Sequence, residues 1–314
     1  MIKLPTDADI LPPSDDRIFK TLLTHPDAKR VLMDIVSAVI ERPVLNVEVR
    51  NVESPKMDVD EKAERLDVNC TVDNGDQVDV EMHSSPIKEI DDAHSNFINK
   101  SIYYLTDLHS SQTSKGVKYY ELVRTYQITF CGYTVFTEWP DFVNRFSLRR
   151  PTGEQVSDQI SMVIIELSKL NSLLRKPVEK LTSFEMWSLF LNFASDPLHR
   201  GLINEIIYTK EEIGMASSLL MEISKDERER AIFRSRRMAE TDRVSDLLTS
   251  EEIGERRERK IWQTVVADKD AVIANKDALL AGKDAVIAGK DALLADKDVE
   301  IAQLREQMKG LRQG

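Results

Sequence analysis

Residues 65–83 alternate between apolar and polar side chains in two short stretches that a turn sequence separates. Successive side chains of a β-strand point to opposite faces of a sheet, so each stretch predicts a strand with one apolar and one polar face. Asn74-Gly75, between the stretches, is typical of a tight hairpin turn. The segment therefore predicts an antiparallel hairpin whose apolar face lies on a core. That face would hold Leu66, Val68, Cys70, Val72, Val78, Val80 and Met82.

The length of the turn decides which residues of the hairpin pair. A two-residue turn at Asn74-Gly75 would pair Asp67 with Met82 and set apolar side chains opposite polar ones. A three-residue loop over 73–75 pairs Asp67 with Glu81 instead, which keeps the apolar residues on one face. We therefore expect the longer loop, with Gly75 at a positive φ.

In this register the carboxylates of Asp67 and Glu81 face each other, with Cβ atoms about 4.5–5.5 Å apart. Asp79 and His83 flank Glu81 on the same polar face. Two facing carboxylates repel unless they share a proton or bind a divalent cation. Oxygen ligands suit Mg²⁺ or Mn²⁺, with the histidine favouring Mn²⁺ slightly, and such a metal activates water and stabilises a phosphoryl transition state. The alternative is an ordinary solvated polar face of a hairpin.

The rest of the first 150 residues predicts a mixed α/β unit. Helix is expected at 17–40, with a break at Pro26, and again at 93–112. Strands are expected at 44–53 and 124–136, in addition to the hairpin. The predicted order is helix, three strands, helix, strand. On the second helix the expected buried side is Phe97, Ile98, Ile102, Leu105 and Leu108.

The C-terminal part of the chain predicts helix, ending in a repeat. Residues 165–260 read as successive helices, and from Lys269 the chain repeats every seven residues, as KDAVIAN, KDALLAG, KDAVIAG, KDALLAD and KDVEIAQ. A period of seven is typical of a coiled coil, although with Ile273 at an a position Lys276 falls at d. We expect a long helix through which copies of the chain associate as a homo-oligomer. The alternative is a tail that arose by repeat expansion and has no selected role.

Composition excludes several function classes. The chain carries 43 Lys+Arg against 54 Asp+Glu, a net charge of -11, which argues against a generic basic coat for nucleic acid but not against a nuclease with a local basic surface. The two cysteines, Cys70 and Cys131, form no disulfide framework or zinc motif, and we expect reduced thiols in a cytoplasmic protein. No apolar run reaches the ~18 residues of a membrane span, so no membrane association is expected.

Several short motifs, in order along the chain, resemble the PD-(D/E)XK nuclease superfamily. A strand aspartate, a hairpin and then Glu-x-(Lys or Gln) on the next strand form its signature. More narrowly, the chain resembles the Rpn-type family of recombination-promoting nucleases and transposases, over roughly residues 12–255. The motifs that carry the resemblance are DRIFK at 16–20 (D-x-x-F-K), LDV at 66–68, VEMH at 80–83, KSIYY at 100–104 (R-x-x-Y-Y) and EMW at 185–187 (E-x-W).

The resemblance implies a fold and a division into domains. The fold class is α/β, with a restriction-endonuclease-like core over residues 1–160. A helical extension over 161–255 would follow, and the seven-residue repeat itself predicts a heptad-repeat helix, a possible coiled coil, over 256–314.

The resemblance also implies roles for individual residues. Asp67 and Glu81 would bind the catalytic Mg²⁺, with Mn²⁺ as the alternative. His83 occupies the place where the family has Gln or Lys, and it would orient the attacking water. Lys100 stands where the family has Arg, and it would meet a DNA phosphate or neutralise the acid pair. Supporting residues would be Asp79 as an outer-sphere ligand, and Asp16 and Lys20 at the start of the first helix, where Asp16 could equally be an N-cap.

The function implied is a metal-dependent DNA endonuclease of bacteria that promotes recombination or belongs to mobile elements. A second hypothesis is a degenerate nuclease fold that serves as an oligomerisation or interaction module, because His83 lacks the fixed charge of lysine. A third is that the substrate is RNA, since nothing in the sequence separates the two nucleic acids.

Overall fold

The computed structural model describes two compact units. They comprise Met1–Phe233 and Arg234–Gly314. Within them the described residues are 3–6, 9–50, 68–84, 93–113 and 117–312.

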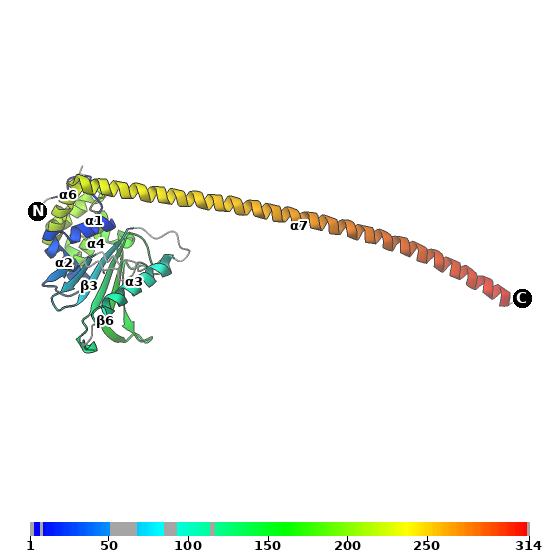
Figure 1. Cartoon of the computed structure of the whole chain (residues 1–314), viewed down its shortest axis with the longest axis horizontal. Coiled ribbons are helices and arrows are strands. Elements are labelled where there is room, and N and C mark those ends of the chain that lie inside the picture. The colour runs from blue at the N-terminus through cyan, green and yellow to red at the C-terminus, as the bar shows by residue number, and fades with distance from the viewer. Residues whose placement is uncertain (1–2, 7–8, 51–67, 85–92, 114–116, 313–314) are drawn as a thin grey trace. The chain divides into compact units, whose positions relative to one another are not determined.

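The first unit is built on a six-stranded mixed sheet (Figure 1). In chain order the strands are β1 (Val47–Val49), β2 (Val68–Val72), β3 (Gln77–His83), β4 (Thr125–Cys131), β5 (Val143–Arg149) and β6 (Gln155–Glu166). Their order in the sheet is β1-β2-β3-β4-β6-β5. The pairs β3/β4 and β4/β6 are parallel, and the other three pairs are antiparallel. A parallel pair needs a crossover connection, and α3 (Ala93–Ser110) lies in the connection between β3 and β4.

Helices cover both faces of the sheet (Figure 1). The larger core lies between one face and the helices α1 (Asp16–Leu23), α2 (Lys29–Ile40), α4 (Ser183–Phe193), α5 (Arg200–Thr209) and α6 (Glu211–Lys225). On the other face α3 packs through Phe97 and Leu105 on Met162 and Ile164 of β6. The predicted break between the first two helices is confirmed, because the short 3₁₀ turn Pro26–Ala28 separates α1 from α2.

The motif at residues 185–187 stabilises the fold. Glu185 completes a capping box with Thr182 at the start of α4. Trp187 is fully buried, and its indole Nε1 donates a hydrogen bond of 2.6 Å to Asp34 of α2. Lys210 pairs with the same aspartate at 2.9 Å. These contacts join α4 and the start of α6 to α2.

The structure differs from the sequence prediction at β5, β6 and α3. The predicted order stops at the strand that became β4, whereas a further hairpin, β5–β6, completes the sheet. β6 begins with a polar, half-exposed stretch and ends in the buried run Met162–Ile165, so no single period marks it as one strand. On α3, Ile102 is 47% exposed, while Ser101 is buried. The expected burial of Ile102 is therefore wrong.

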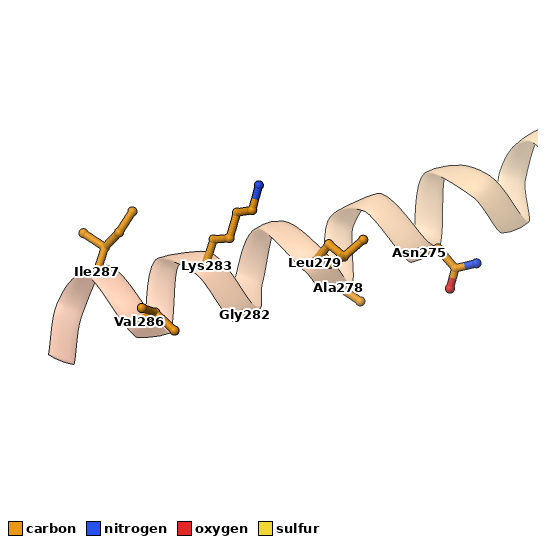
Figure 2. A pocket seen from close by; sticks show the side chains of 7 residues that line it. All are labelled: Asn275, Ala278, Leu279, Gly282, Lys283, Val286 and Ile287. Atoms are coloured by element: carbon orange, nitrogen blue, oxygen red, sulfur yellow. The ribbon is translucent and has the colours of Figure 1, made fainter. Parts of the chain in front are cut away.

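The helix α7 (Glu227–Arg312) begins at the end of the first unit and provides the second. The large apolar side chains of its repeat are exposed, among them Ile273, Leu280, Ile287 and Leu294. Figure 2 shows the repeat around Gly282, where the missing side chain leaves a hollow lined by Ala278, Leu279 and Val286 among others. None of the helices in the described ranges is long and apolar enough to cross a membrane.

Candidate active site

The polar face of the hairpin is buried. Asp79 is 1% exposed and Glu81 is 3% exposed, although both belong to a strand whose opposite face packs in the larger core. β4 extends this polar face, since Gln127 pairs with Asp79 in the parallel register and Thr129 pairs with Glu81. Both β4 side chains are also buried. The alternative of a solvated hairpin face does not hold for these two acids.

The predicted hairpin geometry is confirmed as far as the described residues extend. Val68 lies opposite Val80 and Asn69 opposite Asp79, which is the register of a three-residue loop. Gly75 has the expected positive φ of 85°. Asp67 lies outside the described residues, so the register ends one residue before the proposed Asp67–Glu81 pair.

Glu81 has polar neighbours but no strong cationic partner. Its Oε2 lies 3.3 Å from Nε2 of His83 and 3.5 Å from Nε2 of Gln127. No lysine or arginine in the described part of the chain forms an ion pair with it. A buried carboxylate is unfavourable without compensation, so this environment fits a bound cation. The described ranges contain no group of three or more His, Cys, Asp or Glu side chains arranged for a metal. A site at Glu81 would therefore need Asp67 or oxygens of other kinds.

Oxygens of other kinds are present on the same face of the sheet as Glu81. Five buried oxygens of uncharged side chains on this face have no hydrogen-bond partner among the described residues. They are Asn69 Oδ1, Thr71 Oγ1, Gln77 Oε1, Gln127 Oε1 and Thr129 Oγ1. Buried polar atoms are normally hydrogen-bonded, so the face is suited to a polar ligand such as water or a hydrated cation. Sequence reasoning missed the β4 members, although TYQITFC at 125–131 shows the same alternation as the hairpin.

His83 lies at the carboxyl end of β3, half-buried against α3. Its ring meets Phe97 edge-on, with 5.3 Å between the centroids and an interplanar angle of 86°. On the other side of the strand His83 pairs with Cys131 of β4. The imidazole therefore lies between Glu81 and the aromatic side chain of α3.

Asp16 also reaches the end of β3, but it is not the N-cap of α1. That role belongs to Asp15, whose side chain accepts hydrogen bonds from the backbone amides of Arg17 and Ile18. Asp16 Oδ1 instead accepts from the backbone nitrogen of Ser84 at 3.1 Å and from its hydroxyl at 2.7 Å. Burial raises the pKa of the Tyr133 phenol, and the nearby Asp16 carboxylate adds to the shift. Asp16 thus lies beside the residue that follows His83.

The two candidate lysines lie on the helices to either side. Lys20 is one turn further along α1 than Asp16 and is partly exposed. Lys100 is partly exposed on α3, with its Nζ 5.2 Å from the ring centroid of Tyr104. It forms no ion pair with a carboxylate of the described residues, so neutralisation of Glu81 by Lys100 is not seen.

Neither cysteine is suited to nucleophilic or ligand chemistry at neutral pH. Burial, together with the charge of Asp79, raises the pKa of the Cys70 thiol to about 12. Burial likewise raises the pKa of Cys131, with Glu166 and Glu81 adding to the shift. Both thiols therefore remain protonated.

A comparison of the chain with known families gives a match. Residues 13–250 match the model of a family described as PD-(D/E)XK nuclease family transposase. The chain belongs to this family. The match confirms the membership that the motifs predicted, and it covers α1 to α6 and the start of α7. No curated protein and no solved structure gives a significant match to the chain. Membership of a PD-(D/E)XK nuclease family indicates a nuclease of the hydrolytic type.

Proposed function

We propose that the protein is a metal-dependent endonuclease that hydrolyses phosphodiester bonds of DNA. Membership of a PD-(D/E)XK nuclease family supports the reaction class. The observation that carries the proposal is Glu81, a buried carboxylate beside His83 with no lysine or arginine paired to it within the described ranges. A site of this kind is suited to a divalent cation.

Asp67 and Glu81 would hold Mg²⁺, or Mn²⁺ as the alternative. When bound, the ion lowers the pKa of a coordinated water and stabilises the charge that develops on the phosphate. Asp79, buried on the same face, would hold a water of the ion as an outer-sphere ligand. His83 would hydrogen-bond the attacking water and keep it in line with the phosphorus.

Binding of the substrate would use cations beside the site. Lys100 on α3 and Lys20 on α1 are partly exposed, so each could reach a DNA phosphate while its stem stays packed. Cleavage of DNA by a transposase-type family fits a role in recombination or in mobile elements of bacteria. A DNA substrate and two reduced thiols fit the cytoplasm.

The repeat of α7 would join copies of the chain into a homo-oligomer. Alanine recurs along it at alternating spacings of three and four residues, which is the spacing of the a and d positions of a coiled coil. The alanines are Ala271, Ala274, Ala278, Ala281, Ala285, Ala288, Ala292 and Ala295. Small side chains let two helix backbones approach closely. The partner would be α7 of a second copy of the chain, because its alanines recur with the same spacing.

The test of the nuclease is cleavage of a plasmid in Mg²⁺ or Mn²⁺ by the wild type and by Glu81→Gln and Asp67→Asn. Each substitution keeps the side-chain size but removes a charged ligand. We expect the rate to fall by about 10²-fold or more, the order that loss of one electrostatic stabiliser produces. Glu138→Gln, at an exposed loop position, is the matched control and should cleave as the wild type does. Equal cleavage by Asp67→Asn and the wild type would contradict the proposal.

The second candidate function is an interaction module on a catalytically degenerate nuclease fold. It is favoured by His83 in place of lysine or glutamine. Calorimetry with Mg²⁺ and Mn²⁺ separates the two candidates, because a module without catalysis would bind neither ion while still forming oligomers. The same cleavage assay with RNA decides which nucleic acid is the substrate.

A further inference from the structure

The end of β3 is held from two sides by residues outside the hairpin. From α1, Asp16 Oδ1 accepts both donors of Ser84, the backbone nitrogen at 3.1 Å and the hydroxyl at 2.7 Å. From the end of β4, the backbone nitrogen of Gly132 donates a hydrogen bond of 2.8 Å to the carbonyl oxygen of His83. The peptide that joins His83 to Ser84 is therefore held between two elements.

Gly132 makes this arrangement possible because it has no side chain. A Cβ atom at position 132 would lie 2.8 Å from the carbonyl oxygen of Ser84, closer than real Cβ contacts occur. It would also lie 3.4 Å from the carbonyl carbon and from Cα of the same residue. Since all three neighbours are backbone atoms, none can swing aside. Any larger residue would move β4 away from Ser84.

The held peptide carries the imidazole of the proposed site. His83 is the last residue of β3, and it pairs in the parallel register with Cys131, the last residue of β4. Strand ends with few partners open readily. The contacts of Asp16 and Gly132 oppose such opening, and Phe97 supports the ring itself.

We propose that Asp16, Ser84 and Gly132 form a clamp that positions His83 against Glu81. The three are positioning residues, and none of them touches the substrate. The inference rests on the proposed nuclease function and deepens it. It also gives Asp16 a role other than that of a helix cap, since its Oδ1 accepts two hydrogen bonds from Ser84.

A double-mutant cycle on the full chain tests the clamp. Asp16→Ala removes the acceptor of both hydrogen bonds, whereas Ser84→Ala removes only the hydroxyl. With saturating metal we expect Asp16→Ala to lower kcat by about tenfold or more, as loss of a supporting contact around a metal site does, with KM unchanged. Ser84→Ala should have a smaller effect, and none in the Asp16→Ala background. Ser84→Thr, which keeps the hydroxyl, should restore kcat.

Asp15→Ala is the matched control. It removes the N-cap of the same helix, so it should lower the melting temperature without lowering kcat. Two kinetic results would overturn the clamp: a loss of kcat in Asp16→Ala no larger than in Asp15→Ala, or effects of Asp16→Ala and Ser84→Ala that multiply.

An NMR measurement keeps the clamp testable whether or not the chain cleaves DNA. With ¹³C-labelled histidine, the ring signal of His83 should move in Asp16→Ala and in Gly132→Ala but stay in place in Asp15→Ala. If the wild type and Glu81→Gln are equally inactive while this pattern holds, the nuclease proposal fails and the clamp stands. If the His83 signal does not move in Asp16→Ala, the clamp proposal is wrong, while the nuclease proposal is unaffected.

Discussion

His109 and Gln112 tie the end of α3 to the segment that leads into β4. His109 Nδ1 lies 2.9 Å from Thr125 Oγ1, and Gln112 Nε2 donates to the same hydroxyl at 2.9 Å. The amide of Gln112 also bonds the backbone of Val123 in both directions, accepting at 2.9 Å and donating at 3.1 Å. This network sets where β4 begins, and thereby the register that brings Gln127 beside Asp79.

Burial lowers the pKa of His109, which gives a pH dependence of stability with a definite sign. The folded chain favours the neutral imidazole, so the unfolded chain binds the proton first as pH falls below about 6.5. The stability that the neutral His109 contributes is fully present above that pH. It is lost as the pH falls toward the lowered pKa of His109 in the folded chain. We expect the wild type to lose more melting temperature between pH 7 and pH 5 than His109→Gln does. Parallel losses in the two chains, measured by thermal denaturation, would contradict this assignment.

The site could be predicted from sequence only where its geometry is local. The hairpin register and the φ of Gly75 follow from alternation within 19 residues, 65–83. Asp79 and Glu81 are buried because β4 lies beside β3 and α3 packs on this face of the sheet. The alternation within the hairpin does not indicate either contact. The contact of Asp16 with Ser84 spans 68 residues of chain, and no local pattern connects the motif at 16–20 with the residue that follows the motif at 80–83.

A helix or strand can be predicted from sequence when its apolar residues keep one spacing along its whole length. The helix α2 keeps the helical spacing, with Val31, Leu32, Ile35, Val36 and Val39 buried, and the strand β3 alternates apolar and polar residues throughout. β6 changes from half-exposed to buried along its length, because only its later part lies within the layer that the helices cover. The first, polar residues of β6 therefore show no alternation that would predict a strand.

If copies of the chain associate through α7 as proposed, a charge should weaken association only when it is placed on the face that makes the contact. Ala281 belongs to the row of alanines that recur every three or four residues, whereas Leu280 lies on the other side of the helix with the large apolar residues. Ala281→Glu should weaken association by placing a charge between closely packed backbones. Leu280→Glu should not, and both keep the helix because glutamate is a good helix former. Light scattering of the full chain over a range of concentrations measures the difference. Dissociation by Leu280→Glu alone would assign the interface to the other face.

On the scale of the whole molecule, the net charge of -11 is spread through the folded part. Residues 61–150 carry 14 acids and 10 bases, while residues 261–314 carry 9 acids and 8 bases. Residues 61–150 therefore carry no excess of positive charge that would attract DNA in general, and the proposed nuclease would have to rely on a few cations beside the site and on its metal. A protein that contacts few phosphates binds DNA weakly. Its binding constant also falls only slowly as the salt concentration rises, because few counterions are released.

The division into two units predicts that Met1–Phe233 folds by itself. The start of α7, up to Phe233, belongs to this unit and contacts the rest of it. Glu229 pairs with Arg17 at 2.8 Å, Arg230 pairs with Asp9, and Phe233 packs against the core. Truncation after Phe233 should shift the melting temperature by less than about 2 °C, the shift that ~1 kcal/mol produces in a domain of this size. It should also abolish self-association, since the repeat is removed.

Truncation after Asp226 is the informative control for that experiment. It leaves Arg17 and Asp9 without their partners and uncovers the apolar surface beneath Phe233. It should therefore melt several degrees lower than the chain that ends at Phe233, because two ion pairs and an aromatic contact are lost. If the longer truncated chain is already unfolded, α7 beyond Phe233 is part of the folding unit. In that case the first unit depends on this helix for its stability.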